Sequence, residues 1–435
     1  MRLRSIMLVF PFALAILPAF AQDAPMFRGN LAHTGVYEAV GVTKTPKVKW
    51  KFQTAGRLIS SPAIVNGTAY IGSFDGNLYA VDTERGAVKW KFETQGSVSS
   101  SPAVAGGLVY FGSYDGNFYA VDSATGKKQW SFQTEGERRF AAKNINGILP
   151  EKETMPDFWD FYLSSPVVWE GKVYFGSGDG NIYALDATSG ALKWKFKTGN
   201  VVHTSPAIAN STLFIGGFDT FFYALNATTG EEKWRYKTGE DPSIHNQEGI
   251  TSSAAVADGI VYFGCRDSHL YFIEAETGRR ITEFFGGGGW ISNSPAVKDG
   301  KIYFGGGSDG RFQWLDSKTG ATVFSLNIEA GTFASPVIAG NLLYVASFNN
   351  ELQAFDVTTH NVVWKFNTVA SGQEAVEKSG AKPQPGPLEQ LNFYDDRVGA
   401  MVNRLNRGIF LSSPVVVGNV VYIASTDGAL YALTE

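Results

Sequence analysis

Residues 60–96 carry the stretch that specifies the fold, SSPAIVNGTAYIGSFDGNLYAVDTERGAVKWKFETQG. Its apolar runs are short, as at residues 69–72 and 78–82, and a run that carries Trp90 ends the unit. Turns that contain Gly and Asp separate these runs. Short strands joined by such turns are typical of antiparallel sheet and not of a helical repeat. The stretch therefore predicts one four-stranded antiparallel unit.

The unit recurs at a period of about 40 residues, which is typical of repeat architectures built from one small sheet per repeat. Its opening element is found eight times: Ser60-Ser61-Pro62-Ala63, Ser100-Ser101-Pro102-Ala103, Ser164-Ser165-Pro166-Val167, Thr204-Ser205-Pro206-Ala207, Ser252-Ser253-Ala254-Ala255, Asn293-Ser294-Pro295-Ala296, Ala334-Ser335-Pro336-Val337 and Ser412-Ser413-Pro414-Val415. The sequence therefore predicts an all-β propeller of eight four-stranded antiparallel blades.

The last unit lacks its fourth strand, because it stops at Leu433. Residues 47–54, near the N-terminus, match the fourth strand of the first unit at residues 87–94. We expect this N-terminal strand to pair with the C-terminal strands and close the ring, which leaves no open blade at the seam.

The motif Ala80-Val81-Asp82-x3-Gly86-x3-Trp90 recurs at residues 120–130, 184–194 and 224–234. It resembles the tryptophan-docking repeat of the pyrroloquinoline-quinone (PQQ)-like propellers, and the resemblance covers nearly all of residues 22–435. In that family each Trp packs its ring against the neighbouring blade. The resemblance implies this structural role for Trp50, Trp90, Trp130, Trp194, Trp234 and Trp364.

Two blades depart from the docking motif. In the fifth, Glu274 and Thr282 stand at the Asp and Trp positions, and in the sixth Phe324 replaces Trp. We expect these two blades to be the least like the others.

Residues 1–21 have the pattern of a secretory signal peptide. Arg2 and Arg4 precede an apolar run over residues 6–20, and small residues at Ala19 and Ala21 suit a cleavage site. We expect an exported protein of the bacterial periplasm or the medium, with one domain over residues 22–435. No second apolar stretch has the length of a membrane span and no Cys follows the signal, so neither a span nor a lipid anchor is expected.

Composition excludes several classes of function. The formal net charge of −4 gives no basic footprint, so nucleic acid is not an expected partner. The single Cys265 cannot form an intramolecular disulfide. The five His residues show no paired metal spacing, so no metal site is predicted.

Three insertions interrupt the regular spacing, at about residues 136–162, 239–250 and 369–409. Strand alternation places all three on one face, around the mouth of the channel, where propellers commonly bind. The first insertion is dense in aromatic residues, which serve either as an anchor for a partner or as a lid over the face. The third opens with a Gly/Pro-containing linker over residues 371–387. Apolar residues at helical spacing follow it and predict one amphipathic helix, which lies on the propeller face or, alternatively, is free to bind a partner; they are Leu391, Tyr394, Val398, Met401, Val402 and Leu405.

The candidate binding residues are polar and aromatic side chains in or near these insertions. They are Arg138, Arg139, Trp159, Tyr162, His203, His245, Glu248, Trp290 and Arg407, with Arg57 nearby. No catalytic residue is predicted among them.

The first functional hypothesis is an exported, non-catalytic scaffold. It is similar in size and blade number to BamB, the propeller lipoprotein of the outer-membrane barrel-assembly machinery, although that family carries a lipidated Cys. On this hypothesis a monomer binds another protein on its insertion-bearing face. A sugar- or peptide-binding propeller that uses the aromatic insertions is a related alternative.

The second hypothesis is a quinoprotein dehydrogenase of alcohols or sugars, with PQQ and calcium held above the channel. Such enzymes characteristically stack the quinone on a disulfide between adjacent cysteines, which a single Cys cannot form. If the protein nevertheless binds PQQ, the resemblance implies that Trp290 or Trp159 stacks on the quinone in place of the disulfide. Glu248 or Asp160 would then serve as the metal ligand or the base. No cofactor is predicted on the first hypothesis.

Overall fold

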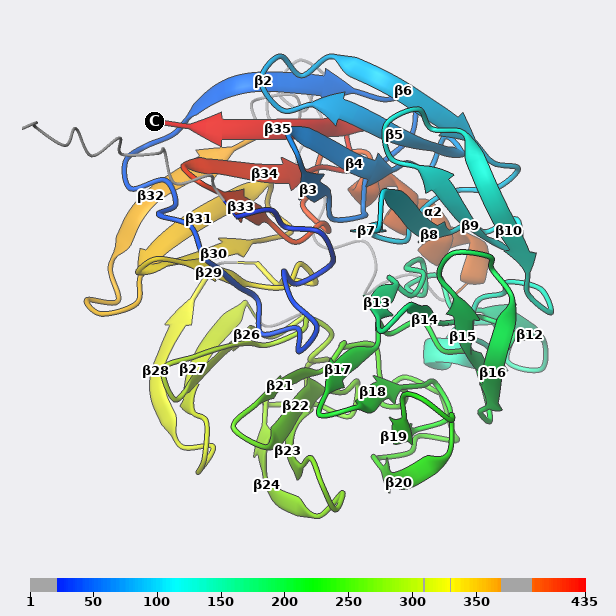
Figure 1. Cartoon of the computed structure of the whole chain (residues 1–435). Coiled ribbons are helices and arrows are strands. Elements are labelled where there is room, and N and C mark those ends of the chain that lie inside the picture. The colour runs from blue at the N-terminus through cyan, green and yellow to red at the C-terminus, as the bar shows by residue number, and fades with distance from the viewer. Residues whose placement is uncertain (1–21, 308–309, 329, 369–392) are drawn as a thin grey trace, which may run out of the picture.

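The chain forms a ring of eight blades around a central channel (Figure 1). The computed structural model describes residues 22–307, 310–328, 330–368 and 393–435. Each blade is an antiparallel sheet whose first strand lines the channel and whose fourth strand lies at the rim. The predicted fold class is confirmed.

Blades one to four take their strands in sequence order, from the channel to the rim. Their bounds are β3 (Ala63–Val65), β4 (Thr68–Gly72), β5 (Asn77–Asp82) and β6 (Val88–Glu93); β7 (Ala103–Ala105), β8 (Leu108–Gly112), β9 (Asn117–Asp122) and β10 (Lys128–Gln133); β13 (Val167–Trp169), β14 (Lys172–Gly176), β15 (Asn181–Asp186) and β16 (Leu192–Lys197); β17 (Ala207–Ala209), β18 (Thr212–Gly216), β19 (Phe221–Asn226) and β20 (Glu232–Lys237).

Blades five to seven follow the same order, and blade eight takes its rim strand from the N-terminal part of the chain. Their bounds are β21 (Ala255–Ala257), β22 (Ile260–Gly264), β23 (His269–Glu274) and β24 (Arg280–Phe285); β25 (Ala296–Lys298), β26 (Lys301–Gly305), β27 (Arg311–Asp316) and β28 (Thr322–Asn327); β29 (Val337–Ala339), β30 (Leu342–Ala346), β31 (Glu351–Asp356) and β32 (Val362–Asn367); β33 (Val415–Val417), β34 (Val420–Ala424), β35 (Ala429–Thr434) and β2 (Lys47–Gln53).

The predicted closure of the ring is confirmed by the pairing of β2 with β35. The two strands are antiparallel, with Trp50 opposite Ala432, and they lie side by side at the top of Figure 1. Blade eight is therefore a complete four-stranded sheet.

A closed ring of hydrogen bonds joins the eight blades around the channel. In each opening element, the Ser before Pro or Ala donates its backbone N–H to the Oγ of the same Ser in the next blade, at 2.8–3.1 Å. Ser413 donates to Ser61 and completes the circle. All of these groups are buried, so each bond satisfies a backbone donor that water does not reach.

An N-terminal strap, residues 24–42, crosses the channel at the end opposite the insertions (Figure 1). It exchanges backbone hydrogen bonds with seven of the eight blades, and its short strand β1 (Val36–Tyr37) runs parallel to β29. The buried Arg28 points its guanidinium at the carbonyl oxygens of Pro295 and Pro336, at 2.8 and 2.5 Å. The strap therefore closes this end of the channel and ties the blades together.

Five of the docking Trp residues join neighbouring blades, and the sixth, Trp364, joins blade seven to Val42 of the strap. Each donates its Nε1–H to a backbone carbonyl at 2.7–3.1 Å. The ring of Trp50 lies so close to Gly86 that a Cβ there would stand 2.8 Å from it, and Gly86 also has a φ of +67°. Glycine is required here because a side chain would collide with the ring.

Blades five and six keep the strand register of the other blades but differ in this docking layer. Where Ala80 lies opposite Trp90 in blade one, Phe272 lies opposite Thr282 and Trp314 lies opposite Phe324. The large aromatic ring has moved to the third strand, where it fills the space that the missing Trp leaves. In blade seven His360 replaces the motif glycine, and its ring lies 4.3 Å from that of Trp314.

The serine ring gives a direct test of how the blades are held together. Changing Ser205→Ala removes the acceptor of the buried Ser165 N–H. We expect the free energy of unfolding to fall by about 1–3 kcal/mol, the usual cost of leaving a buried donor unpaired. Urea denaturation measures it. Ser131→Ala, on the exposed face of β10, is the control and should change little; equal losses in the two variants would contradict the assigned role.

Candidate functional site

The insertions fold together over the channel mouth as a lid. Its apolar interior contains aromatic side chains from the first insertion and from the blade turns below it, and α2 (Tyr394–Leu405) contributes Met401 and Leu405. The buried apolar residues are Ile59, Phe140, Ile145, Ile148, Phe158, Phe161, Val201, Phe218, Phe348, Met401, Leu405, Ile409 and Leu411. The aromatic side chains of the first insertion therefore pack inward.

Hydrogen bonds connect the three insertions to one another. The first forms the hairpin of β11 (Ala141–Lys143) and β12 (Thr154–Pro156), with the short η1 (Ile145–Gly147) between them. The Asn146 N–H donates to Ile244 of the second insertion at 2.6 Å. The Tyr394 hydroxyl of α2 donates to the Pro156 carbonyl at 2.6 Å.

The predicted helix is confirmed as α2, and it packs on the first insertion instead of extending freely. Its predicted apolar position Leu391, and the linker over residues 371–387, lie outside the described residues.

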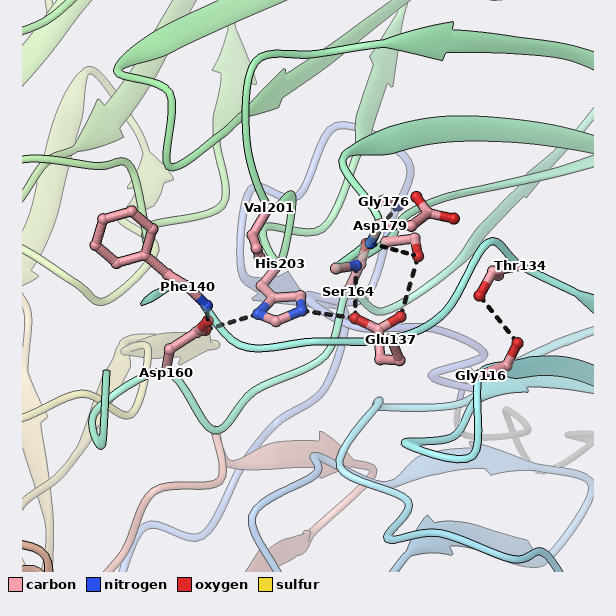
Figure 2. Close-up of polar contacts among 12 residues, drawn as sticks. Gly116, Thr134, Glu137, Phe140, Asp160, Ser164, Gly176, Asp179, Val201 and His203 are labelled. Atoms are coloured by element: carbon pink, nitrogen blue, oxygen red, sulfur yellow. Dashed lines mark hydrogen bonds and ion pairs between the residues drawn. The ribbon is translucent and has the colours of Figure 1, made fainter. Parts of the chain in front are cut away.

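A buried imidazole ties both ends of the first insertion to blade four (Figure 2). His203, in the loop before β17, contacts Asp160 Oδ1 through Nδ1 at 2.6 Å and Glu137 Oε1 through Nε2 at 2.8 Å. The other Asp160 oxygen accepts the Phe140 N–H at 2.7 Å, and Glu137 accepts the Gly178 N–H at 2.5 Å. The two carboxylates therefore hold the histidine and the loop backbone at once.

Two opposing effects act on the pKa of His203. Burial lowers it, whereas attraction to and hydrogen bonds with Asp160 and Glu137 raise it and prevail, to a pKa of about 10. At neutral pH the ring is therefore a cation between two carboxylates, and a charged hydrogen bond forms on each side.

A second buried ion pair anchors the middle of the same insertion. Asp157 contacts Arg266, and its other oxygen accepts the Trp159 N–H at 2.9 Å. The Arg266 guanidinium lies 4.2 Å from the ring centre of Trp290 and 4.9 Å from that of Phe218. Such cation–π contacts stabilise a charge that is shielded from water.

The structure brings four of the predicted residues into the lid and its base: Trp159, Tyr162, His203 and Trp290. The Tyr162 hydroxyl donates to the Leu411 carbonyl at 3.0 Å.

The other predicted residues do not converge on one site. His245 and Glu248 contact each other at 2.5 Å within the second insertion, and Arg139 lies over the ring of Tyr114. Arg138 and Arg407 are exposed.

Sequence reasoning missed Glu137, Asp157 and Arg266. Arg266 had a visible signal, because it follows Cys265 in the turn where blades one, two, four and seven carry Phe or Tyr. A charged residue at a repeat position that is aromatic in four of the other blades indicates a local partner. The two carboxylates had no such signal, since their partners lie more than 60 residues away along the chain.

The residues at this mouth do not fit PQQ with calcium. One face of Trp290 is covered by Arg266, and Trp159 meets Trp290 edge to face with an interplanar angle of 85°, so they offer no pair of flat faces. Asp160 is bound to His203 and Glu248 to His245. Among the described residues, no group of three or more His, Cys, Asp or Glu side chains is arranged to hold a metal ion.

The ring, the docking Trp residues and the covered channel define an eight-bladed propeller of the PQQ-repeat class. A family model described as outer membrane protein assembly factor BamB matches residues 39–149, 157–285 and 286–384. The chain belongs to this family.

Solved structures share the fold at low identity. BamB of Moraxella catarrhalis is 16% identical with a TM-score of 0.64, covering 90% of this chain and 98% of that one. Quinohemoprotein alcohol dehydrogenase of Comamonas testosteroni is 15% identical with a TM-score of 0.69, covering 95% and 80%. A europium-containing methanol dehydrogenase is 15% identical with a TM-score of 0.69, covering 95% and 98%.

None of the curated proteins compared with the chain matches it significantly. Within the described residues, no helix combines the length and the apolar character needed to cross a membrane.

The charged His203 cluster predicts a pH dependence of stability. Its pKa is raised from 6.5 in the unfolded chain to about 10 in the folded protein. Its stabilising contribution is therefore complete below about pH 6.5 and is lost as the pH rises towards 10. We expect the difference in unfolding free energy between the native protein and His203→Gln to shrink over this range.

Urea denaturation at pH 6, 8 and 10 measures this difference. Ser131→Ala, which changes an exposed side chain of β10 that carries no charge, is the control and should show no such trend. A difference for His203→Gln that stays constant with pH would contradict the charged state assigned to the ring.

Proposed function

We propose that the protein is an exported, non-catalytic propeller that binds another protein on its lid face. The main support is a contrast within the lid. Its buried charged side chains form ion pairs with one another, whereas its outer surface exposes apolar side chains. Phe393 is 61% exposed and Leu149 36%. These two neighbouring residues are called the lid patch.

The lid patch has a rigid base. Leu149 and Phe393 are joined by a backbone bridge, and the Tyr394 N–H donates to the Leu149 carbonyl at 2.8 Å. The ion pairs of His203 and Arg266 hold the insertion beneath them. Exposed apolar groups on a preorganised base suit protein association, since little conformational entropy is lost when a partner binds.

Family membership and the resemblance to BamB support this proposal. Residues 1–21 have the pattern of a signal peptide, and with them we place the protein in the bacterial periplasm or the medium. On this proposal a single chain is the binding unit, because one lid patch makes the contact.

The quinoprotein alternative is tested by titration with PQQ and calcium. Because Arg266 and the lid aromatics occupy the mouth of the channel, we expect calorimetry to show no saturable heat of binding. We expect no dye-linked oxidation of alcohols or sugars. Stoichiometric binding accompanied by turnover would overturn the proposed function.

The lid patch is tested by site-specific crosslinking in cells. A photoreactive residue at position 393 should give a discrete adduct with one protein, identified by mass spectrometry. The control is position 88 on β6, because Val88 is 52% exposed but lies at the rim.

Purified components then test the contact directly. Changing Leu149→Asp should weaken binding of the identified protein by about tenfold or more, since a charge opposes burial of an apolar contact. Val88→Asp should not weaken it. Equal effects of both changes, or adducts from both positions, would contradict a specific lid-face site.

A further inference from the structure

The rim of the ring consists of eight edge strands. Within the part of the chain that the structure describes, the fourth strand of each blade pairs on one side alone, so alternate N–H and C=O groups face outward. Such an edge can pair with a strand from another chain, and charged residues, above all Lys, normally prevent this.

Seven of the eight rim strands carry such charges. They are β2 with Lys47, Lys49 and Lys51; β6 with Lys89, Lys91 and Glu93; β10 with Lys128; β16 with Lys193, Lys195 and Lys197; β20 with Glu232, Lys233, Arg235 and Lys237; β24 with Arg280 and Glu283; and β32 with Lys365.

The rim strand of blade six, β28, has the sequence TVFSLN and no charged residue. Val323 is 45% exposed, and Thr322 and Ser325 are exposed as well. The hydrogen bond from the Ile328 N–H to Gly310 sets the alternation along β28. By that alternation, the N–H and C=O of Ser325 face away from the sheet.

The residue that follows the docking position decides whether a strand can pair with its own copy. In six blades this residue is charged: Lys51, Lys91, Lys195, Arg235, Glu283 and Lys365. An antiparallel pair centred there would place like charges directly opposite each other, which is destabilising. In β28 the residue is Ser325. It carries no charge, so it can lie opposite Ser325 of a second chain without electrostatic repulsion.

Blade two is the nearest comparison, because β10 has Ser131 at the equivalent position. It begins with Lys128, however, and it exposes no large apolar side chain of the kind that Val323 provides. β10 and β28 are the two rim strands with an uncharged residue at this position. Of these two, only β28 lacks charged residues altogether and also exposes a large apolar side chain, that of Val323.

We propose that β28 is a self-association edge, at which two copies of the chain pair antiparallel about a two-fold axis centred on Ser325. The register sets Val323 opposite Asn327 of the second copy and joins the two blade-six sheets into one. An isologous contact of this kind closes after two chains. It lies at the rim, so it does not depend on the proposed function of the lid.

The contact is weak, because two six-residue strands bury less than the roughly 1,200 Å² of a stable interface. We expect sedimentation equilibrium of the full mature chain to show a reversible dimer, with a Kd of about 10 μM to 1 mM. Ser325→Lys should weaken the dimer by about tenfold or more, because it sets two lysines opposite each other.

The matched control is Ser131→Lys, which places the same residue at the same position of blade two. It should leave the dimer unchanged. A monomer up to about 1 mM, or equal weakening by both changes, would overturn the proposal. Circular dichroism and the thermal midpoint establish that each variant is folded, and hydrogen exchange should show β28 amides gaining protection with concentration.

Discussion

The closed ring of backbone N–H to serine Oγ bonds is the constraint on which the rest of the structure depends. Each blade both donates and accepts one bond, so the circle is complete when Ser413 meets Ser61. That last bond joins residues 352 apart in the sequence, and it forms only if all the intervening blades are in place. The docking Trp residues then fasten neighbouring blades farther from the channel, where the sheets diverge.

Both ends of the channel are closed, by different physical means. At one end the strap adds backbone hydrogen bonds to the inner strands, and the terminal nitrogens of Arg28 donate to carbonyl oxygens instead of an acid. At the other end the lid is held by ionic groups, with His203 and Arg266 each facing carboxylates in a buried setting. Closure at both ends leaves the outer surfaces, and not the channel, as the regions open to partners.

Particular residues show how far prediction from the repeat could go. The eight opening elements predicted the blades, and the match of residues 47–54 to residues 87–94 predicted the closure, because a repeat imposes the same local pattern many times. The change at Thr282 predicted an altered fifth blade, but its compensation by Phe272 required the cross-strand register. The candidate site was predicted less well: His203 was chosen without its partners, and Arg138 and Arg407 face solvent.

By itself the sequence determined the fold class, the number of blades, the strand that closes the ring and the helix in the last insertion. These features follow from short-range periodicity and turn chemistry, which act within about 40 residues. Only the tertiary structure decided that the strap crosses the channel, that the aromatic residues of the insertions pack inward and that Glu137, Asp160 and His203 meet. Those contacts join segments that are far apart in the sequence, so no local pattern predicts them. They form because closure of the ring brings the segments together, and because a buried charge is costly unless it is paired.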